Sequence, residues 1–215
     1  MHPARFRRLC TFVFILAAFT PLASAKTLCV NPKGTSGCYA KIQDAVNAAA
    51  KFDVINLAVG VYKEDVVIGK PLSLIGAGAG MSIIDATNLP NGILLDGLNN
   101  RGLRDVTVAA LSVKNALYEG VIVLNTTGAV IRDTHILHND TTPHTFGSGA
   151  ACDGQPAYET DESGDCGGGL HLIGAVRTVV SGNQITGNAD GILISDETAE
   201  SRGNVIVNNI VTDNP

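Results

Sequence analysis

The stretch GVIVLNTTGAVIRDTHILHN, residues 120–139, holds three short apolar runs that are separated by turn-forming residues. The same pattern starts at three other glycines, Gly92, Gly169 and Gly191. A pattern that recurs roughly every 20–30 residues indicates a solenoid, in which each repeat buries its apolar faces against the next one. Three apolar runs and three turns per repeat favour one coil of a three-faced β-helix.

Aligning the four glycines brings similar residues into columns. Three columns are apolar, and they hold these residues: Ile93/Leu95, Val121/Val123, Leu170/Leu172 and Ile192/Ile194; Val108, Ile131, Val180 and Ile206; Val113, Ile136, Ile185 and Val211. Two columns become polar along the chain: Leu111, Thr134, Asn183 and Asn209; Ala116, Asn139, Asn188 and Asn214. Buried amides must be hydrogen-bonded, so we interpret the asparagines as an internal structural ladder.

The first half of the chain predicts a capping helix followed by further coils. Tyr39, Ile42, Val46 and Ala49 are spaced as on one face of a helix, and residues 26–37 before them are polar and rich in turn formers. A short amphipathic helix suits the exposed end of a solenoid. Four short strands are expected after it, at residues 54–57, 66–68, 72–75 and 82–85.

These segments resemble the opening of right-handed parallel β-helix proteins of the pectin-lyase-like superfamily, and pectinesterase-like members most of all. The resemblance lies in YAKIQDAVNAA (39–49), DVINL (53–57), GVYKEDVVI (60–68) and LSLIGAGAG (72–80). It implies an all-β, right-handed parallel β-helix with a short N-terminal capping helix. It does not imply one activity, because function depends on the site and not on the fold.

Residues 1–25 are typical of a secretory signal peptide. They combine a basic start, an apolar run and the small-residue cleavage site Ala23-Ser24-Ala25. The apolar run is too short to span a bilayer, and no later stretch is long enough. The predicted divisions are therefore a signal at 1–25, a cap at 26–52 and β-helix coils at 53–215, and we expect a secreted, extracellular or periplasmic protein.

Removing residues 1–25, which contain three arginines and no acid, leaves 12 basic and 20 acidic residues, so the formal charge falls from −5 to −8. An acidic surface that is poor in aromatic residues argues against nucleic acid as a partner. Cys29, Cys38, Cys152 and Cys166 remain as disulfide candidates. Their proximity in sequence favours Cys29–Cys38 and Cys152–Cys166, although four cysteines allow three pairings.

The repeat is interrupted at residues 140–168 by an insertion that contains six acids and no Lys or Arg. Insertions of solenoids lie on one face, which is often the binding face. Asp161, Glu162 and Asp165 are candidate calcium ligands, because calcium prefers several oxygen ligands. A solvated acidic loop tied by a disulfide is the alternative.

The histidines form a second candidate surface site. His135 and His138 belong to one coil, His144 begins the insertion, and His171 belongs to the next coil. Histidine is the commonest metal ligand and general base near neutral pH. The alternative is four scattered surface histidines. His171 also stands in an outward column with Leu94, Ile122 and Leu193, whose apolar members suggest a contact surface.

Motifs of known β-helix enzymes are largely missing. Asn188-Ala-Asp-Gly191 is similar to one polygalacturonase motif, but Asp190 shares its column with Asn91, Glu119 and Gly168, so we interpret it as a turn residue. Arg132 and Arg177 match a lyase base by residue type only. We expect a binding or structural protein that contacts glycan or the cell envelope, without demonstrated catalysis. The alternative is an enzyme for acidic polysaccharide, partly encoded beyond Pro215, where we expect the natural protein to continue.

Overall fold

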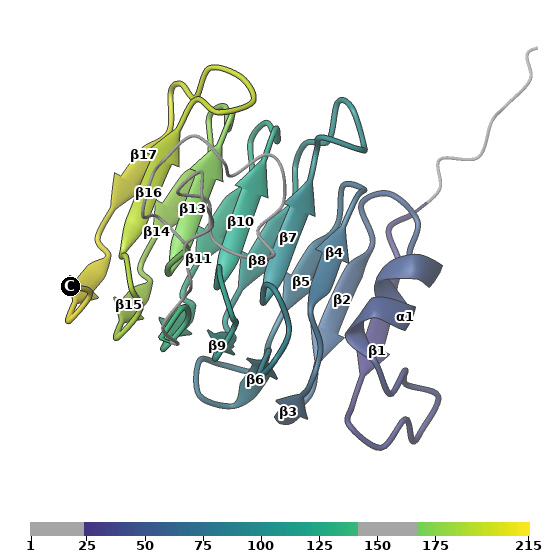
Figure 1. The fold of residues 1–215 in the computed structure, drawn as a ribbon. Coiled ribbons are helices and arrows are strands. Elements are labelled where there is room, and N and C mark those ends of the chain that lie inside the picture. Colours follow the sequence, from purple (N-terminus) through teal and green to yellow (C-terminus); the bar gives the residue numbers. More distant parts are fainter. Residues whose placement is uncertain (1–23, 142–166) are drawn as a thin grey trace, which may run out of the picture.

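The computed structural model describes residues 24–141 and 167–215, which form a parallel β-helix with three sheets (Figure 1). We name the sheets in the order in which the chain reaches them in each complete coil. Strand pairing between successive coils is parallel and in register, as for β7, β10 and β13. The predicted fold class is therefore confirmed.

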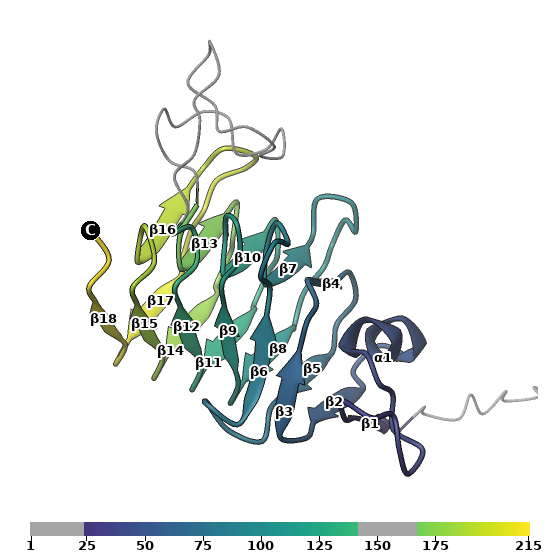
Figure 2. The same cartoon turned by 60° about the horizontal axis from the view of Figure 1, so that its bottom comes forward.

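The first sheet has seven strands, which are β1 (Thr27–Val30), β2 (Val54–Leu57), β5 (Ser73–Ile75), β8 (Thr107–Ala109), β11 (Val130–Arg132), β14 (Val179–Ser181) and β17 (Val205–Val207). The second sheet has six, which are β3 (Gly60–Tyr62), β6 (Ser82–Asp85), β9 (Ser112–Lys114), β12 (His135–Leu137), β15 (Gln184–Thr186) and β18 (Ile210–Thr212). The third sheet has five, which are β4 (Val66–Ile68), β7 (Ile93–Asp96), β10 (Val121–Leu124), β13 (Leu170–Ile173) and β16 (Ile192–Ser195). Figure 2 shows the three sheets around one common interior.

Two strands occur where the sequence analysis expected none. Strand β1 lies within residues 26–37, which were expected to be turn-rich, and it pairs with β2 through partners such as Leu28 and Ile55. Strand β3 pairs with β6. Both segments are short, and the neighbouring coil supplies the hydrogen bonds that make them strands.

The helix α1 (Ile42–Ala48) covers the first coils at the N-terminal end of the solenoid (Figures 1 and 2). Its apolar face, with Ile42, Ala45 and Val46, is buried in the core. Both ends are held by side chains from other segments. The Glu64 carboxylate accepts the N–H groups of Ile42 and Gln43, and the Lys70 ammonium donates to two carbonyls at the other end. The expected capping helix is therefore present.

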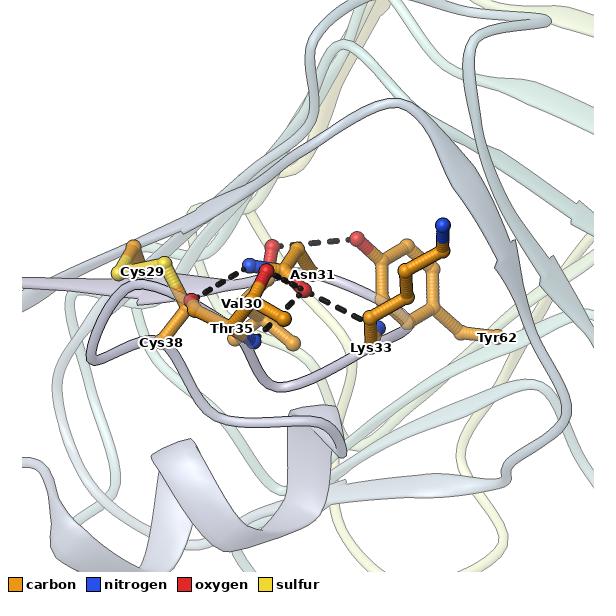
Figure 3. Close-up of a disulfide and its surroundings, with 7 residues drawn as sticks. All are labelled: Cys29, Val30, Asn31, Lys33, Thr35, Cys38 and Tyr62. Atoms are coloured by element: carbon orange, nitrogen blue, oxygen red, sulfur yellow. Dashed lines mark hydrogen bonds between the residues drawn. A yellow bond between two sulfur atoms is a disulfide. The ribbon is translucent and has the colours of Figure 1, made fainter.

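The N-terminal segment is tied by a disulfide between Cys29 and Cys38 (Figure 3). The loop that it closes is ordered by Asn31, whose side chain bonds the backbone of Lys33 and Thr35. The Tyr62 hydroxyl donates to the Val30 carbonyl at 3.2 Å and so links the loop's base to β3. One of the two predicted disulfides is confirmed. Cys152 and Cys166 lie outside the described residues.

The glycines that mark the repeat have a steric reason. A Cβ atom on Gly92, Gly120 or Gly169 would lie 2.6–2.7 Å from the carbonyl oxygen of the corresponding glycine in the next coil. Carbon and oxygen cannot approach that closely without displacing one coil. Glycine is therefore required for coils to stack at these positions.

The asparagine columns form the predicted internal ladder. Asn188 Oδ1 accepts the backbone N–H and the side-chain amide of Asn139, at 3.0 and 2.8 Å. Asn214 does the same for Asn188, and Asn209 for Asn183. Asn139, Asn183 and Asn188 are all buried. Each amide therefore joins two coils from inside the solenoid, as the sequence analysis predicted.

Candidate functional site

A buried polar network lies on the outer face of the third sheet, around His171. The flanking residues Leu170 and Leu172 belong to the hydrophobic core, so His171 points the opposite way, because successive side chains of a strand alternate between faces. The histidine is nevertheless only 2% exposed. The alternative of a surface histidine is therefore wrong for His171.

Among the described residues, Glu119, Ser195 and Glu197 surround the imidazole, and we call them, together with His171, the outer-face network. His171 Nδ1 lies 3.1 Å from Glu119 Oε1, and His171 Nε2 lies 2.9 Å from Ser195 Oγ. Ser195 Oγ also lies 3.0 Å from Glu197 Oε2, which is 3.9 Å from His171 Nε2. The side chains of Glu119 and Glu197 are 3% and 7% exposed. Two carboxylates, a hydroxyl and an imidazole thus share one buried site.

Three successive coils supply this network. Glu119 lies in the turn before β10, His171 is on β13, and Ser195 ends β16. The parallel register pairs His171 with Ile122 on one side and with Leu193 on the other, and it pairs Ser195 with Ile173. Stacking at one coil spacing therefore brings together residues that are up to 78 positions apart in the sequence, Glu119 and Glu197.

The coils themselves show that the fold does not need this network. At the position of His171 other coils carry Leu94, Ile122 and Leu193, and at the position of Ser195 they carry Asp96, Leu124 and Ile173. Ile122, Leu124 and Ile173 form a small buried apolar cluster of their own. Ile122 is fully buried, so the outward apolar column is not exposed at this position.

Three consecutive glycines, residues 167–169, allow the chain to pack closely beside the outer-face network. A Cβ on Gly168 would lie 2.8 Å from the Cβ of Asp190, and one on Gly167 would lie 2.7 Å from the Tyr118 backbone. Glu119 and Asp190 line one crevice with these glycines. Asp190 lies just before β16, where its carbonyl accepts the N–H of Gly169 at 2.8 Å. This backbone role agrees with its interpretation as a turn residue.

The proton count allows the network two hydrogen-bond arrangements. The Ser195 hydroxyl has one proton and two acceptors within 3.0 Å, namely His171 Nε2 and Glu197. When His171 is protonated, both ring nitrogens donate and the hydroxyl donates to Glu197. When His171 is neutral with its proton on Nδ1, the hydroxyl can donate to Nε2 in place of Glu197. The second arrangement links a hydroxyl, a base and an orienting carboxylate in series.

The other predicted histidines do not join His171. His135 is half-buried on β12 and His138 is exposed just after it, both on the second sheet, whereas His171 belongs to the third. His138 packs on Gly187 of the next coil. His144 lies outside the described residues. The predicted histidine cluster is therefore not formed by the three histidines that the structure describes.

The calcium prediction concerns Asp161, Glu162 and Asp165, which lie outside the described residues, so it stays a prediction. Within residues 24–141 and 167–215, no group of three or more His, Cys, Asp or Glu side chains is arranged to hold a metal ion. Arg132 and Arg177 are exposed, as a surface role requires. In the same ranges, no helix is long and apolar enough to cross a membrane.

A second candidate site is a basic groove near the N-terminal cap, which we call the Lys51 groove. It has a volume of about 420 Å³ and is lined by Lys51, Phe52, Gly69, Pro71, Asn100, Arg101, Gly102, Leu103 and Arg104. The Phe52 side chain is 52% exposed. Arg104 pairs with Asp105 at 3.4 Å in an exposed ion pair, and Lys51 and Arg101 form no ion pair with any described residue.

The wall of this groove is built by a hydrogen-bonded turn. The Asp96 carboxylate accepts the backbone N–H of Asn99 and its side-chain amide, at 3.0 and 2.9 Å. Asn100 donates to the Asp96 carbonyl and packs on Gly69, where a Cβ would lie 2.4 Å from the Asn100 amide nitrogen. The turn that carries Arg101 and Arg104 is therefore fixed against the first coils.

The sequence analysis missed Glu119, Ser195 and Glu197 as site residues, and it missed the Lys51 groove. A signal for the network was present, because His171 and Ser195 replace Ile122 and Ile173, the apolar residues at the same positions of the preceding coils. No comparable signal marks the groove, since its lining comes from turns that do not repeat.

Comparison with known proteins supports the β-helix fold. Residues 84–215 match the family model of the right-handed β-helix region. An alginate lyase from Paenibacillus sp. str. FPU-7 has a similar structure, with a TM-score of 0.55 and 18% identity over 86% of this chain. Pectin methylesterase PemA from Erwinia chrysanthemi gives a TM-score of 0.52 and 14% identity over 76% of this chain. No curated protein matches the sequence.

This chain spans only part of the solved structures that it matches. The matched part is 50% of the methylesterase and 65% of the alginate lyase. At these identities the likeness shows a shared fold, and activity has to be argued from the sites of this chain.

Proposed function

The chain belongs to the right-handed β-helix family, and on that premise we propose that it is a secreted protein that binds an anionic polysaccharide through the Lys51 groove. The observation that carries this proposal is the concentration of Lys51, Arg101 and Arg104 beside an exposed aromatic ring in one groove. The rest of the chain is acidic, with a formal charge of −5 for the whole sequence. Local positive charge on such a protein favours an anionic ligand at that place.

The chemistry of the groove suits a carboxylated sugar. Guanidinium groups bind carboxylates through paired hydrogen bonds, and Arg101 has no described ion pair that would compete. The exposed ring of Phe52 offers an apolar surface to the face of a sugar ring. A volume of about 420 Å³ lies within the usual size range of ligand sites. Neighbours of the same fold are named for alginate and pectin, which supports a polysaccharide as the ligand.

Export is part of the proposal. Residues 1–25 have the order of a signal peptide, and the Cys29–Cys38 disulfide is typical of oxidising compartments. N-terminal sequencing of the protein released by its natural host tests this part, and a start at Lys26 is expected. Recovery of the intact N-terminus inside the cell would contradict it.

Binding is tested by calorimetry with oligomers of alginate or pectate and with a neutral glucan as the comparison. We expect the anionic oligomers to bind and the neutral one not to bind, with weaker binding at higher salt. The double variant Lys51→Ala/Arg101→Ala should bind about tenfold more weakly, which corresponds to roughly 1.4 kcal/mol. Phe52→Ala should weaken binding at every salt concentration, because its contact is not ionic.

The matched control is Arg132→Ala, which removes a cation on β11, outside the groove lining. It changes the net charge in the same direction, so it separates a local site from general electrostatic attraction. Equal weakening by Arg132→Ala and by Lys51→Ala would contradict the groove. Equal binding of neutral and anionic oligomers would contradict the ligand class.

A further inference from the structure

We propose that the outer-face network is an esterase site, in which Ser195 is the nucleophile, His171 is the general base and Glu119 is the positioning residue. This proposal does not depend on the Lys51 groove. It rests on the series of contacts from Ser195 Oγ to His171 Nε2 at 2.9 Å and from His171 Nδ1 to Glu119 Oε1 at 3.1 Å. Both distances lie within the range in which a nucleophile, its base and an orienting group act together.

The internal repeat makes this arrangement informative. Coils that stack by identical residues do not require a histidine, a serine and a carboxylate in adjacent outward positions, and other coils fill two of these positions with leucine or isoleucine. Burying charged groups costs free energy, and apolar residues of similar size often stabilise a protein as well or better. Buried titratable groups that the fold does not need are typical of functional sites.

The chemistry balances with water as the only co-reactant. Ser195 Oγ forms a bond to the carbonyl carbon of the ester while its proton passes to His171 Nε2. The carbon–oxygen bond to the alcohol then breaks, and the alcohol takes the proton from Nε2. Water attacks the acyl group on Ser195 and gives a proton to Nε2, which returns it to Oγ as the carboxylic acid leaves. Glu119 holds the Nδ1 proton, so that Nε2 stays free to accept.

The surroundings select a class of ester. Glu119 and Glu197 both face the imidazole, and Asp190 lines the same crevice as Glu119, so an anionic acyl or phosphoryl group would be repelled. Ser195 lies beside Ile173 in the register and is 7% exposed. This enclosed position beside an apolar side chain suits a short, uncharged acyl group. The site therefore fits a small neutral acyl ester, such as an O-acetyl group.

Glu197 controls which hydrogen-bond arrangement is populated. Its carboxylate competes with His171 for the Ser195 proton and also favours the protonated imidazole, 3.9 Å away. Among the described residues, the charged groups that face His171 are Glu119, from the turn before β10, and Glu197, from the turn after β16. Hydrolysis should therefore increase as pH rises and His171 loses its second proton.

The experiment uses the full chain, with p-nitrophenyl acetate as the probe for hydrolysis and a fluorophosphonate as the probe for covalent labelling. We expect slow hydrolysis and one adduct, located on Ser195 by mass spectrometry. Ser195→Ala should lose the adduct and at least about a hundredfold of the rate. Ser181→Ala, on the first sheet, is the matched serine control and should behave as the wild type does. p-Nitrophenyl phosphate should not react.

Two conservative variants separate positioning from general structure. Glu119→Gln keeps an oxygen acceptor for Nδ1 but removes the charge, so it should lower kcat at least about tenfold and leave KM unchanged. Glu197→Gln removes the competing carboxylate beside the imidazole, so it should move the half-maximal rate to lower pH. Circular dichroism verifies that each variant is folded.

The proposal is overturned if the folded wild type gives no Ser195 adduct and hydrolyses the probe no faster than Ser195→Ala does. It is also overturned if Glu197→Gln and Glu119→Gln lower the rate equally without a shift of the pH profile, because both would then act on structure alone. Either result leaves binding at the Lys51 groove unaffected, since that groove is tested by calorimetry with separate variants.

Discussion

The inside and the outside of this solenoid both carry buried polar groups that join neighbouring coils, but they do so differently. Inside, Asn139, Asn188 and Asn214 repeat one side chain and one set of hydrogen bonds from coil to coil. Outside, His171 and Ser195 interrupt columns that hold Leu, Ile or Asp elsewhere, and they bond to two carboxylates. A buried polar side chain that recurs from coil to coil indicates a role in coil stacking. A polar side chain that departs from the repeat, and is still buried and hydrogen-bonded, indicates a functional site.

The strongest test of this contrast is on the inner ladder. Asn188→Ala removes the acceptor of the Asn139 N–H groups and the donor to the Ile136 carbonyl, inside the core. Because buried groups lose their partners, the free energy of unfolding should fall by about 2–4 kcal/mol. Urea denaturation measures this change. Asn56→Ala, at an exposed position on β2, is the control and should change stability by less than about 0.5 kcal/mol.

The hydrolysis rate of the same variant completes that test. Asn188→Ala should retain the wild-type hydrolysis rate per folded molecule, because the ladder lies on the other side of the backbone from Ser195. A loss of stability no greater than that of Asn56→Ala would show that the ladder does not carry the stacking energy.

The repeat glycines provide a second test of coil stacking, at the level of the backbone. A Cβ at Gly120 would meet the carbonyl oxygen of Gly169 at 2.6 Å, whereas the three atoms nearest to one at Gly191 belong to side chains, with Val211 nearest. A backbone oxygen cannot move aside, but a side chain can. Gly120→Ala should therefore cost about 1–3 kcal/mol of unfolding free energy, and Gly191→Ala should cost clearly less. Equal costs in chemical denaturation would show that the aligned glycines do not act through coil stacking.

Asp53 is a counterexample to the rule that a buried polar residue outside the repeat indicates a functional site. It is buried and occurs once, yet it serves structure, because its carboxylate accepts the backbone N–H groups of Lys26 and Ala50 at 2.7 and 2.8 Å. These bonds hold the pKa of Asp53 below its usual value of 3.8. A carboxyl with a lowered folded pKa stabilises the protein above its unfolded pKa and loses that effect as pH falls.

Asp53→Asn should therefore be less stable than the wild type near pH 6, and the difference should shrink as pH falls below 4. Thermal unfolding across this pH range measures the difference, with the exposed Asp65→Asn as the control. A difference that stays constant with pH would mean that charge on Asp53 contributes nothing.

Most of the fold could be predicted from the sequence, because the residue pattern of one coil recurs several times along the chain of a solenoid. The apolar columns, the asparagine ladder, the capping helix and the local Cys29–Cys38 bridge all follow from residues close in sequence or aligned by the repeat. Strands β1 and β3 could not be found in this way. Both are too short for a periodic signal, and pairing with a distant coil decides their conformation.

The candidate sites were less accessible to sequence reasoning. His171 was identified as a candidate, but its partners are distant in the chain, and grouping it with His135 and His138 was wrong because those residues belong to another sheet. Glu119 was recognised only as a member of a turn column. The register of three coils decides that Glu119, His171 and Ser195 meet, and it follows from the structure.

The central claim, that the inner ladder serves stacking and the outer-face network serves function, is tested most directly by the hydrolysis rate of p-nitrophenyl acetate per folded molecule. We predict that Ser195→Ala stays folded and loses the rate, whereas Asn188→Ala keeps the rate while it loses stability. Retention of the wild-type rate by folded Ser195→Ala would contradict the claim.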